Sequence, residues 1–299
     1  MDLWTDIAKN ISVATSSTTG KDFCIHKKSS VAGGCISSAF RISDGAQEYF
    51  VKLNSAEQLE MFTAEAEGLQ EIAKAKAVHV PSPVCYGTSH GQAYLVMEAL
   101  ELGASKPESM TLLGEQLAAM HQTTQPKFGW YRDNTIGATH QPNQWNHDWL
   151  SFWREQRLGF QLTLAAEKGA HRSLINKGEQ LLDNTDIFFT NYQPQASLLH
   201  GDLWSGNYAI TTQGVPVIFD PAVYFGDREA DIAMTELFGG FSQDFYAAYN
   251  NAWPLDDGYK TRKIFYNLYH ILNHFNLFGG SYASQAEDMM DRLLLEIIK

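Results

Sequence analysis

The second half of the chain is dominated by helical apolar patterns, and one polar stretch interrupts them. Residues 200–207 read His-Gly-Asp-Leu-Trp-Ser-Gly-Asn. Two short apolar segments follow, separated by Gln213-Gly214, and the second ends at Asp220. Short apolar segments on either side of a glycine-containing turn are typical of a β-hairpin. The chain must therefore fold with a loop and a hairpin set among helices.

The expected hairpin brings oxygen-bearing side chains together. Counting outward from a two-residue turn places Thr212 opposite Val215 and Asn207 opposite Asp220. An amide oxygen beside a carboxylate suits Mg²⁺, which keeps several waters and binds nucleotide phosphates. Asp202 would then stand near the metal without ligating it, as a general base does. The alternative is that the Asp and Asn side chains only cap turns.

The N-terminal region predicts a small β-rich lobe. Residues 37–42 and 48–53 flank Asp44-Gly45, a dipeptide that favours a hairpin turn. Apolar residues at three- and four-residue steps over residues 59–72 then predict an amphipathic helix.

Lys52 lies between apolar residues of the second strand, and the helix offers Glu65 and Glu67 as partners. A strand lysine paired with a helix glutamate is how kinases hold the α- and β-phosphates of a nucleotide. The alternative is a solvated lysine on the polar face of a half-exposed strand.

A boundary is expected near residue 100. Residues 94–97 read as a buried strand, and residues 102–107 are turn-like. This predicts a nucleotide-binding lobe over residues 1–100, a hinge near 97–102 and a helical lobe over residues 103–299. Within the second lobe, apolar stripes or helical patterns cover residues 113–121, 149–160, 259–278 and 285–298, with a helix stop at 279–281.

Composition excludes several classes. The chain carries 22 basic and 34 acidic side chains, a net charge of −12, and no basic run, which argues against nucleic acid as a partner. We expect no membrane span and no signal peptide. The three cysteines, Cys24, Cys35 and Cys85, form neither a disulfide framework nor a metal motif, and indicate a cytoplasmic protein.

The common phosphate-binding and dinucleotide-binding glycine strings are absent. The nearest substitute is Gly33-Gly34, ahead of the first hairpin strand, where backbone amides can approach phosphates. Cys35 follows directly, and amides aimed at a phosphate would also favour its thiolate. We therefore expect a monomer that forms a Cys35-linked dimer on oxidation, or else an inert, packed Cys35 thiol.

Taken together, these segments resemble the fructosamine-3-kinase (ketosamine kinase) family, within the aminoglycoside-phosphotransferase-like branch of the protein-kinase-like fold. The resemblance extends over nearly the whole chain and is carried by residues 33–36, 50–52, 65–69, 200–207, 220–222, 226–234 and 268–280. It implies an α+β, bilobal fold with a small antiparallel β lobe and a larger, mainly helical lobe.

The resemblance also implies ATP and Mg²⁺ as cofactors and assigns roles. Glu65, four positions before Leu69 as in the family, becomes the partner of Lys52 on the ATP phosphates. The other implied roles are Gly33 and Gly34 beside the nucleotide, Met97, Glu98 and Leu100 at the adenine, Asp202 as base, and Asn207 with Asp220 on Mg²⁺.

Three further residues are candidates for substrate contact, each with a structural alternative. Trp204 either packs over a sugar ring or serves lobe packing. Asp227 belongs to an acidic and basic cluster over residues 227–231, for which we prefer a structural ion-pair role to substrate contact. His274 lies four residues after His270, a spacing compatible with a metal pair, although core or substrate-side packing fits better without a third ligand.

The implied activity is ATP-dependent phosphorylation of the sugar 3-hydroxyl of a ketosamine (a fructosamine, ribulosamine or erythrulosamine), which implies deglycation of glycated amines. Gly201 where protein kinases carry Arg, Asp-Pro-Ala at residues 220–222, and the lack of an Ala-Pro-Glu segment all favour a small-molecule acceptor. The alternatives are a phosphotransferase acting on an aminoglycoside or aminoalcohol, and a nucleotide-binding pseudoenzyme.

Overall fold

The computed structural model describes residues 2–19, 22–31 and 37–298, and the chain divides into two compact units. The first unit consists of Met1–Ser105 and Ala209–Asp220. The second consists of Lys106–Tyr208 and Pro221–Lys299. The sequence pattern suggested a single crossing point near residue 100, whereas the chain crosses back for residues 209–220.

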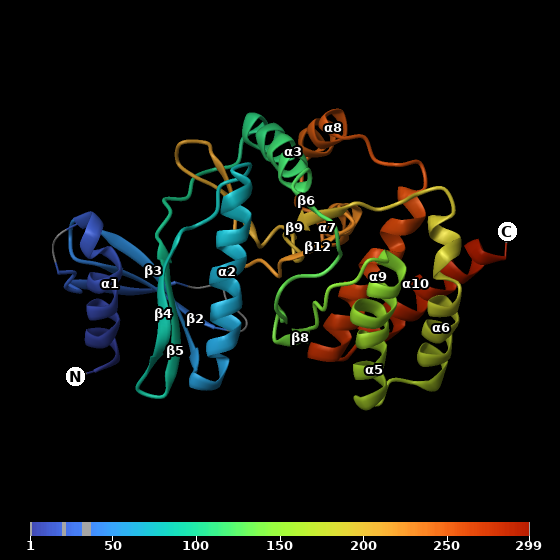
Figure 1. Ribbon diagram of the computed structural model, residues 1–299, viewed down its shortest axis with the longest axis horizontal. Coiled ribbons are helices and arrows are strands. Elements are labelled where there is room, and N and C mark those ends of the chain that lie inside the picture. The colour runs from blue at the N-terminus through green and yellow to red at the C-terminus, as the bar shows by residue number, and fades with distance from the viewer. Residues whose placement is uncertain (1, 20–21, 32–36, 299) are drawn as a thin grey trace. The chain divides into compact units, whose positions relative to one another are not determined.

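The first unit is built on a five-stranded antiparallel sheet in the order β1-β2-β3-β5-β4. Figure 1 shows the sheet with α1 and α2 on its two sides. The elements are α1 (Leu3–Thr19), β1 (Lys27–Val31), β2 (Ser38–Ser43), β3 (Glu48–Ser55), η1 (Ala56–Gln58), α2 (Leu59–Ala75), β4 (Pro83–Ser89) and β5 (Gln92–Glu98). The predicted hairpin, helix and buried strand are confirmed as β2–β3, α2 and β5.

Alternation along β3 decides which side chains face which helix. Val51 and Leu53 are buried in one cluster with Ile7 and Ile11 of α1. Because successive strand residues point to opposite faces, Lys52 projects towards the side covered by α2. The sequence analysis missed α1, although Leu3, Ile7 and Ile11 are spaced four apart, which is a helical signal.

The hairpin over residues 209–220 is formed by β10 (Tyr208–Ile210) and β11 (Pro216–Ile218). The predicted register is wrong by one residue, because the Thr211 N–H, not that of Thr212, donates to the Val215 carbonyl at 2.9 Å. Gly214 has φ +83° and its N–H donates to the Thr211 carbonyl at 2.9 Å. This is a three-residue loop, in which glycine takes the left-handed third position. The register argument for Asn207 opposite Asp220 therefore no longer holds.

The second unit is mainly helical, and a small antiparallel sheet carries the polar loop. Strand β9 (Ala196–Leu199) lies between β6 (Thr124–Gln125) and β12 (Tyr224–Gly226), and Leu199 pairs with Tyr224. The loop that starts at His200 thus leaves one central strand and its continuation returns to the neighbouring one. A short hairpin, β7 (Asn134–Ile136) with β8 (Thr139–Gln141), belongs to the same unit.

Helices make up the rest of the second unit (Figure 1). They are α3 (Pro107–His121), α4 (Trp149–Trp153), the π-helical turn η2 (Arg154–Leu158), α5 (Gly159–Glu167), α6 (Arg172–Asp183), η3 (Thr185–Phe189), α7 (Glu229–Leu237), α8 (Gln243–Ala252), α9 (Tyr259–Phe278) and α10 (Tyr282–Ile297). The predicted stop after residue 278 is confirmed, because Gly279 and Gly280 both have φ +66°. Among the helices of the described ranges, none is long and apolar enough to cross a membrane.

Candidate active site

The first unit contains a lysine that is ion-paired with two carboxylates. Lys52 Nζ lies 2.6 Å from Glu65 Oε1 and 2.5 Å from Asp220 Oδ1. The side chains of Lys52 and Glu65 are only 13% and 12% exposed, whereas that of Asp220 is 44% exposed. Of the two glutamates that the helix offers, the structure brings Glu65 to the lysine.

The charges of this group depend on one another. Burial disfavours the ammonium form of Lys52, but the two carboxylates outweigh burial and raise the pKa of Lys52. Burial raises the pKa of Glu65 to about 7, with the charge of Asp220 adding to the rise and Lys52 opposing it. The lysine is therefore held as a cation close to the more exposed Asp220 carboxylate.

Asp220 has a strained backbone. Its φ is +58°, a left-handed conformation that is uncommon outside glycine and costs about 1–3 kcal/mol. The residue lies two positions after the end of β11 and precedes Pro221. Such strain is concentrated at functional sites, where the surrounding structure fixes a side chain in a required direction.

In the second unit, the loop at residues 200–207 is held from two sides. Asp231, in the first turn of α7, accepts the N–H of His200 at 2.7 Å and the N–H of Gly201 at 2.8 Å. The Ala222 N–H donates to the His200 carbonyl at 2.8 Å. Gly201 has φ +83°, and a Cβ there would lie 2.1 Å from the Ala222 carbonyl oxygen. Only glycine fits this position.

Asn207 fixes the carboxylate of Asp202. Its Nδ2 donates to the Asp202 carbonyl at 2.8 Å and to Asp202 Oδ2 at 3.2 Å. The Asp202 N–H donates to His200 Nδ1 at 3.2 Å, so the His200 ring accepts at Nδ1. Asp202 is partly exposed, whereas His200 and Asn207 are buried. The structure thus presents one oriented carboxylate at the surface of a rigid loop.

Asp231, which holds this loop, is itself held in a hydrogen-bond network with residues of α3 and α8. His121 of α3 lies with Nε2 3.1 Å from Asp231 Oδ2, and its Nδ1 lies 2.8 Å from the hydroxyl of Tyr249. Burial alone would raise the pKa of Asp231, but the bond from His121 and the backbone amides hold it below its ordinary value. Arg228 donates to the Tyr249 hydroxyl at 3.1 Å. The hydrogen bonds from Arg228 through Tyr249 and His121 therefore all run in the direction of the Asp231 carboxylate.

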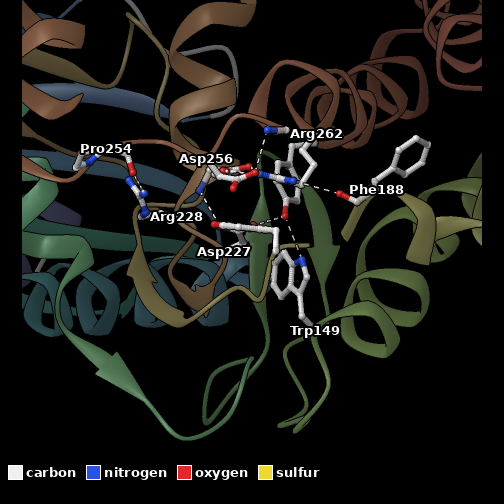
Figure 2. Close-up of polar contacts among 11 residues, drawn as sticks. Trp149, Phe188, Asp227, Arg228, Pro254, Asp256 and Arg262 are labelled. Atoms are coloured by element: carbon white, nitrogen blue, oxygen red, sulfur yellow. Dashed lines mark hydrogen bonds and ion pairs between the residues drawn. The ribbon is translucent and has the colours of Figure 1, made fainter. Parts of the chain in front are cut away.

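A buried ion-pair cluster follows the loop (Figure 2). Arg262 of α9 donates to both carboxylate oxygens of Glu229, at 2.7 and 3.0 Å, and to Asp256 at 2.6 Å. Burial raises the pKa of Glu229 to about 7, which Arg262 opposes. Arg228 donates to the Pro254 carbonyl at 2.6 Å. The cluster ties the start of α7 to the segment before α9.

Asp227 belongs to this cluster and is fully buried. Its carboxylate accepts hydrogen bonds from the hydroxyl groups of Tyr192 at 2.9 Å and Tyr266 at 2.5 Å, and from the N–H of Glu229 at 3.0 Å. The alternative that Asp227 contacts the substrate is therefore wrong, because its carboxylate is fully buried and its oxygens accept hydrogen bonds from within the protein. The preferred structural alternative fits this environment.

The remaining candidates lie in several places. Met97 is buried in β5, Glu98 ends that strand, and the Leu100 carbonyl accepts a bond from Arg41. Trp204 is 39% exposed, and His274 of α9 is half-buried. Gly33, Gly34 and Cys35 lie outside the described residues. Within the described ranges, no group of three or more His, Cys, Asp or Glu side chains forms a metal cluster.

Comparison with known proteins gives the family. A family model described as fructosamine kinase matches residues 4–296. A probable ketoamine kinase from Synechocystis sp. is 50% identical over 296 residues, and the match covers 97% of each chain. The chain belongs to the fructosamine kinase family.

Other fructosamine kinase relatives agree with this assignment. A chloroplastic protein-ribulosamine 3-kinase from Arabidopsis thaliana is 42% identical over 280 residues, covering 93% of this chain and 85% of the relative. The crystal structure of a putative fructosamine-3-kinase from Haemophilus somnus 129PT superposes with a TM-score of 0.88 at 33% identity, covering 97% of both chains.

The wider likeness concerns the fold alone. A thermostable mutant of aminoglycoside phosphotransferase APH(4)-Ia, crystallised with AMP-PNP and hygromycin B, superposes with a TM-score of 0.65 at 17% identity, covering 95% of this chain and 98% of that one. The predicted α+β, protein-kinase-like fold is confirmed.

Sequence reasoning missed the support for the loop of this fructosamine kinase. Asp231 belongs to the charged cluster over residues 227–231, and the residue types there do not predict that it accepts two backbone amides. His121 was assigned to an apolar helix face. The available signal was that both are polar residues at otherwise apolar helix positions, a pattern that requires a buried partner.

Proposed function

We propose that this fructosamine kinase is an ATP-dependent ketosamine 3-kinase. It transfers the γ-phosphoryl group of ATP to the sugar 3-hydroxyl of a fructosamine, ribulosamine or erythrulosamine. The observation that carries the proposal is family membership over residues 4–296, together with relatives named ketoamine kinase and protein-ribulosamine 3-kinase. The oriented Asp202 carboxylate and the Lys52–Glu65 pair supply the matching chemistry.

Asp202 acts as the general base. Its carboxylate accepts the proton of the 3-hydroxyl as that oxygen bonds to the γ-phosphorus and the bond to the ADP oxygen breaks. Asn207 donates to Asp202 Oδ2 at 3.2 Å, which fixes the direction of the carboxylate before the acceptor arrives. Preorganisation of this kind supplies much of the rate in phosphoryl transfer.

Lys52 binds the α- and β-phosphates of ATP. Glu65 holds its ammonium group in place at 2.6 Å and offsets the cost of burying the cation. Met97, Glu98 and Leu100 contact the adenine, and Gly33 and Gly34, which lie outside the described residues, are phosphate contacts predicted from the sequence.

Asn207 and Asp220 are proposed as Mg²⁺ ligands. Their chemistry fits a hard cation. Asn207 uses its amide nitrogen for Asp202, so its amide oxygen is directed away from that bond. Asp220 contacts Lys52 through Oδ1, which leaves its second oxygen outside the ion pair. When bound, Mg²⁺ neutralises negative charge on the phosphates.

The proposal extends to cell chemistry. The phosphorylated ketosamine is expected to release its amine, so the reaction serves deglycation. A cytoplasmic location, and the choice between a monomer and an oxidised Cys35-linked dimer, stay predictions from the cysteine pattern.

The test is a panel assay of ADP release with Mg-ATP. The acceptors are ketosamines of three sugars, an aminoglycoside and an aminoalcohol, and Asp202→Asn serves as the matched control variant. We expect release of ADP with at least one ketosamine and its loss in the variant. Turnover of the aminoglycoside or aminoalcohol in place of every ketosamine would reject the proposal, as would nucleotide binding without any turnover.

A further inference from the structure

We infer that a group of exposed and half-buried aromatic rings, which begins on the loop, binds the ammonium group and the apolar N-substituent of the ketosamine. The group, called the aromatic collar, consists of Trp204, Phe238, His274, Phe278 and Tyr282. The inference rests on the proposed function and deepens it, because it names the part of the substrate that this surface recognises.

The collar is a continuous chain of ring contacts within the second unit. Trp204 meets Phe238 edge-on with centroids 6.3 Å apart. Phe238 lies 5.2 Å from the ring of His274. His274 in turn lies 5.8 Å from Phe278 and 5.1 Å from Tyr282. The rings come from the loop, the end of α7, and the junction of α9 and α10.

Three of the five collar rings are exposed, although such side chains are ordinarily buried. Trp204, Phe238 and Phe278 are 39%, 42% and 61% exposed. Along one face of α9, His270 is buried, His274 half-buried and Phe278 exposed, so the face emerges from the core into the collar. A cluster of exposed aromatic rings is typical of a binding surface.

One collar residue lies on the same loop as the proposed base. Trp204 stands two residues after Asp202, and its ring folds back over Gly206, where a Cβ would lie 2.3 Å from it. In a ketosamine, only two carbons separate the nitrogen from the carbon that carries the 3-hydroxyl. A substrate whose 3-hydroxyl meets Asp202 therefore holds its nitrogen close to the loop, and its N-substituent extends beyond the loop.

Charge favours an ammonium group as the occupant. The secondary amine of a ketosamine is protonated near neutral pH, and aromatic faces attract alkylammonium cations. Elsewhere the protein stacks its own cations on rings, as Arg157 does over Tyr224 at 3.9 Å and Arg228 over Trp253 at 4.1 Å. In the part of the chain that the structure describes, no lysine or arginine stacks on a collar ring. The net charge of −12 adds a general attraction for cations.

His274 adds one polar group. Its Nδ1 lies 2.8 Å from the His270 carbonyl, which accepts only, so Nδ1 carries the hydrogen. In the neutral ring, Nε2 then bears a lone pair. The collar thus combines aromatic faces with acceptor atoms of His274 and Tyr282, which match a secondary ammonium group with its N–H donors.

The experiment compares substrates that differ only at the nitrogen. We use the N-methyl and N-benzyl ketosamines of one sugar, and the thioether analogue of the benzyl compound, which has no charge. Values of kcat/KM are measured for the wild type, Phe238→Ala and Phe278→Ala. Leu295→Ala is the control, because Leu295 is 62% exposed on α10, about 20 Å from Tyr282 at the helical rise per residue.

We expect the wild type to prefer the N-benzyl compound by about tenfold, and the amine over its thioether by about fivefold. Phe278→Ala should lower the benzyl-to-methyl ratio, Phe238→Ala the amine-to-thioether ratio, and Leu295→Ala neither. Equal use of the methyl and benzyl compounds by the wild type, or unchanged ratios in both collar variants, would overturn the inference while leaving the kinase assignment intact. Failure to phosphorylate any ketosamine would instead overturn both.

Discussion

Replacement of Gly201 by alanine tests the geometry of the loop. The added Cβ would lie 2.1 Å from the Ala222 carbonyl oxygen, whereas real Cβ contacts are not shorter than 3.0 Å, so the two segments must separate by 3.0 − 2.1 = 0.9 Å. Gly169→Ala is a matched control. Gly169 has φ +81°, close to the +83° of Gly201, and nothing lies within 4 Å of its Cβ position.

The two variants share the backbone strain and differ in the clash. Alanine in a left-handed conformation costs about 1–2 kcal/mol, which is the whole effect expected at Gly169. At Gly201, separation of the two segments also strains the hydrogen bond from the Ala222 N–H to the His200 carbonyl. It strains the two hydrogen bonds from the N–H groups of His200 and Gly201 to Asp231 as well. Each buried bond that is lost costs about 1–3 kcal/mol. With one such bond lost, we therefore expect Gly201→Ala to lower the free energy of unfolding by about 2–5 kcal/mol.

Activity should separate the variants more clearly. A displacement near 1 Å of a positioned catalytic group costs about a hundredfold in rate. Urea unfolding and kcat for ADP release are measured on both variants and the wild type. Gly169→Ala should keep its kcat, and Gly201→Ala should lose about two orders of magnitude while still folded at low temperature. If both variants behave alike, the close approach of Ala222 to the loop does not constrain the active site.

Three further predictions concern single side chains. Asp220→Ala should weaken Mg-nucleotide binding as well as turnover, and an unchanged Mg²⁺ dependence of kcat/KM would contradict its role as a ligand. Burial lowers the pKa of His270 to about 3, so below pH 6.5 the unfolded state binds more protons and stability falls as the pH falls, by up to about 1.4 kcal/mol per pH unit. His270→Gln should reduce that slope between pH 6.5 and 4, and an unaltered slope in urea unfolding would refute the assignment. Burial raises the pKa of Cys85 to about 12, so iodoacetamide at pH 8 should alkylate the exposed Cys24 first, as peptide mass spectrometry will show, and equal labelling would contradict the burial of Cys85.

Local patterns were sufficient for much of the fold. Apolar spacing over residues 59–72 and 259–278 gave helices, because one helix face must be buried. The hairpin register failed at Gly214 for a specific reason. A glycine in a turn fits either a two-residue or a three-residue loop, and the choice depends on backbone hydrogen bonds that residue types alone do not specify.

The active-site residues divide in the same way. Asp202 and Asn207 lie on one loop, so their motif is visible in the sequence, whereas spacing left Glu65 and Glu67 equally open as partners of Lys52 and only the family resemblance chose Glu65. The contacts of Asp231 with His200 and Gly201 join residues about 30 positions apart, as a consequence of how α7 packs. For Asp227 the sequence left substrate contact as an alternative to a structural role, and its enclosure by Tyr192 and Tyr266 favours the structural role. Burial of a charge depends on tertiary packing and is not visible in a local motif.

The central claim is that Asp202 directs phosphoryl transfer to the sugar 3-hydroxyl of a ketosamine. The most direct measurement is the ³¹P and ¹³C NMR spectrum of the product formed from Mg-ATP and a ¹³C-labelled ribulosamine. We predict a phosphate ester with phosphorus coupling at carbon 3 of the sugar, and no ester above background with Asp202→Asn. An ester at any other hydroxyl, or near-normal product from Asp202→Asn, would contradict the account.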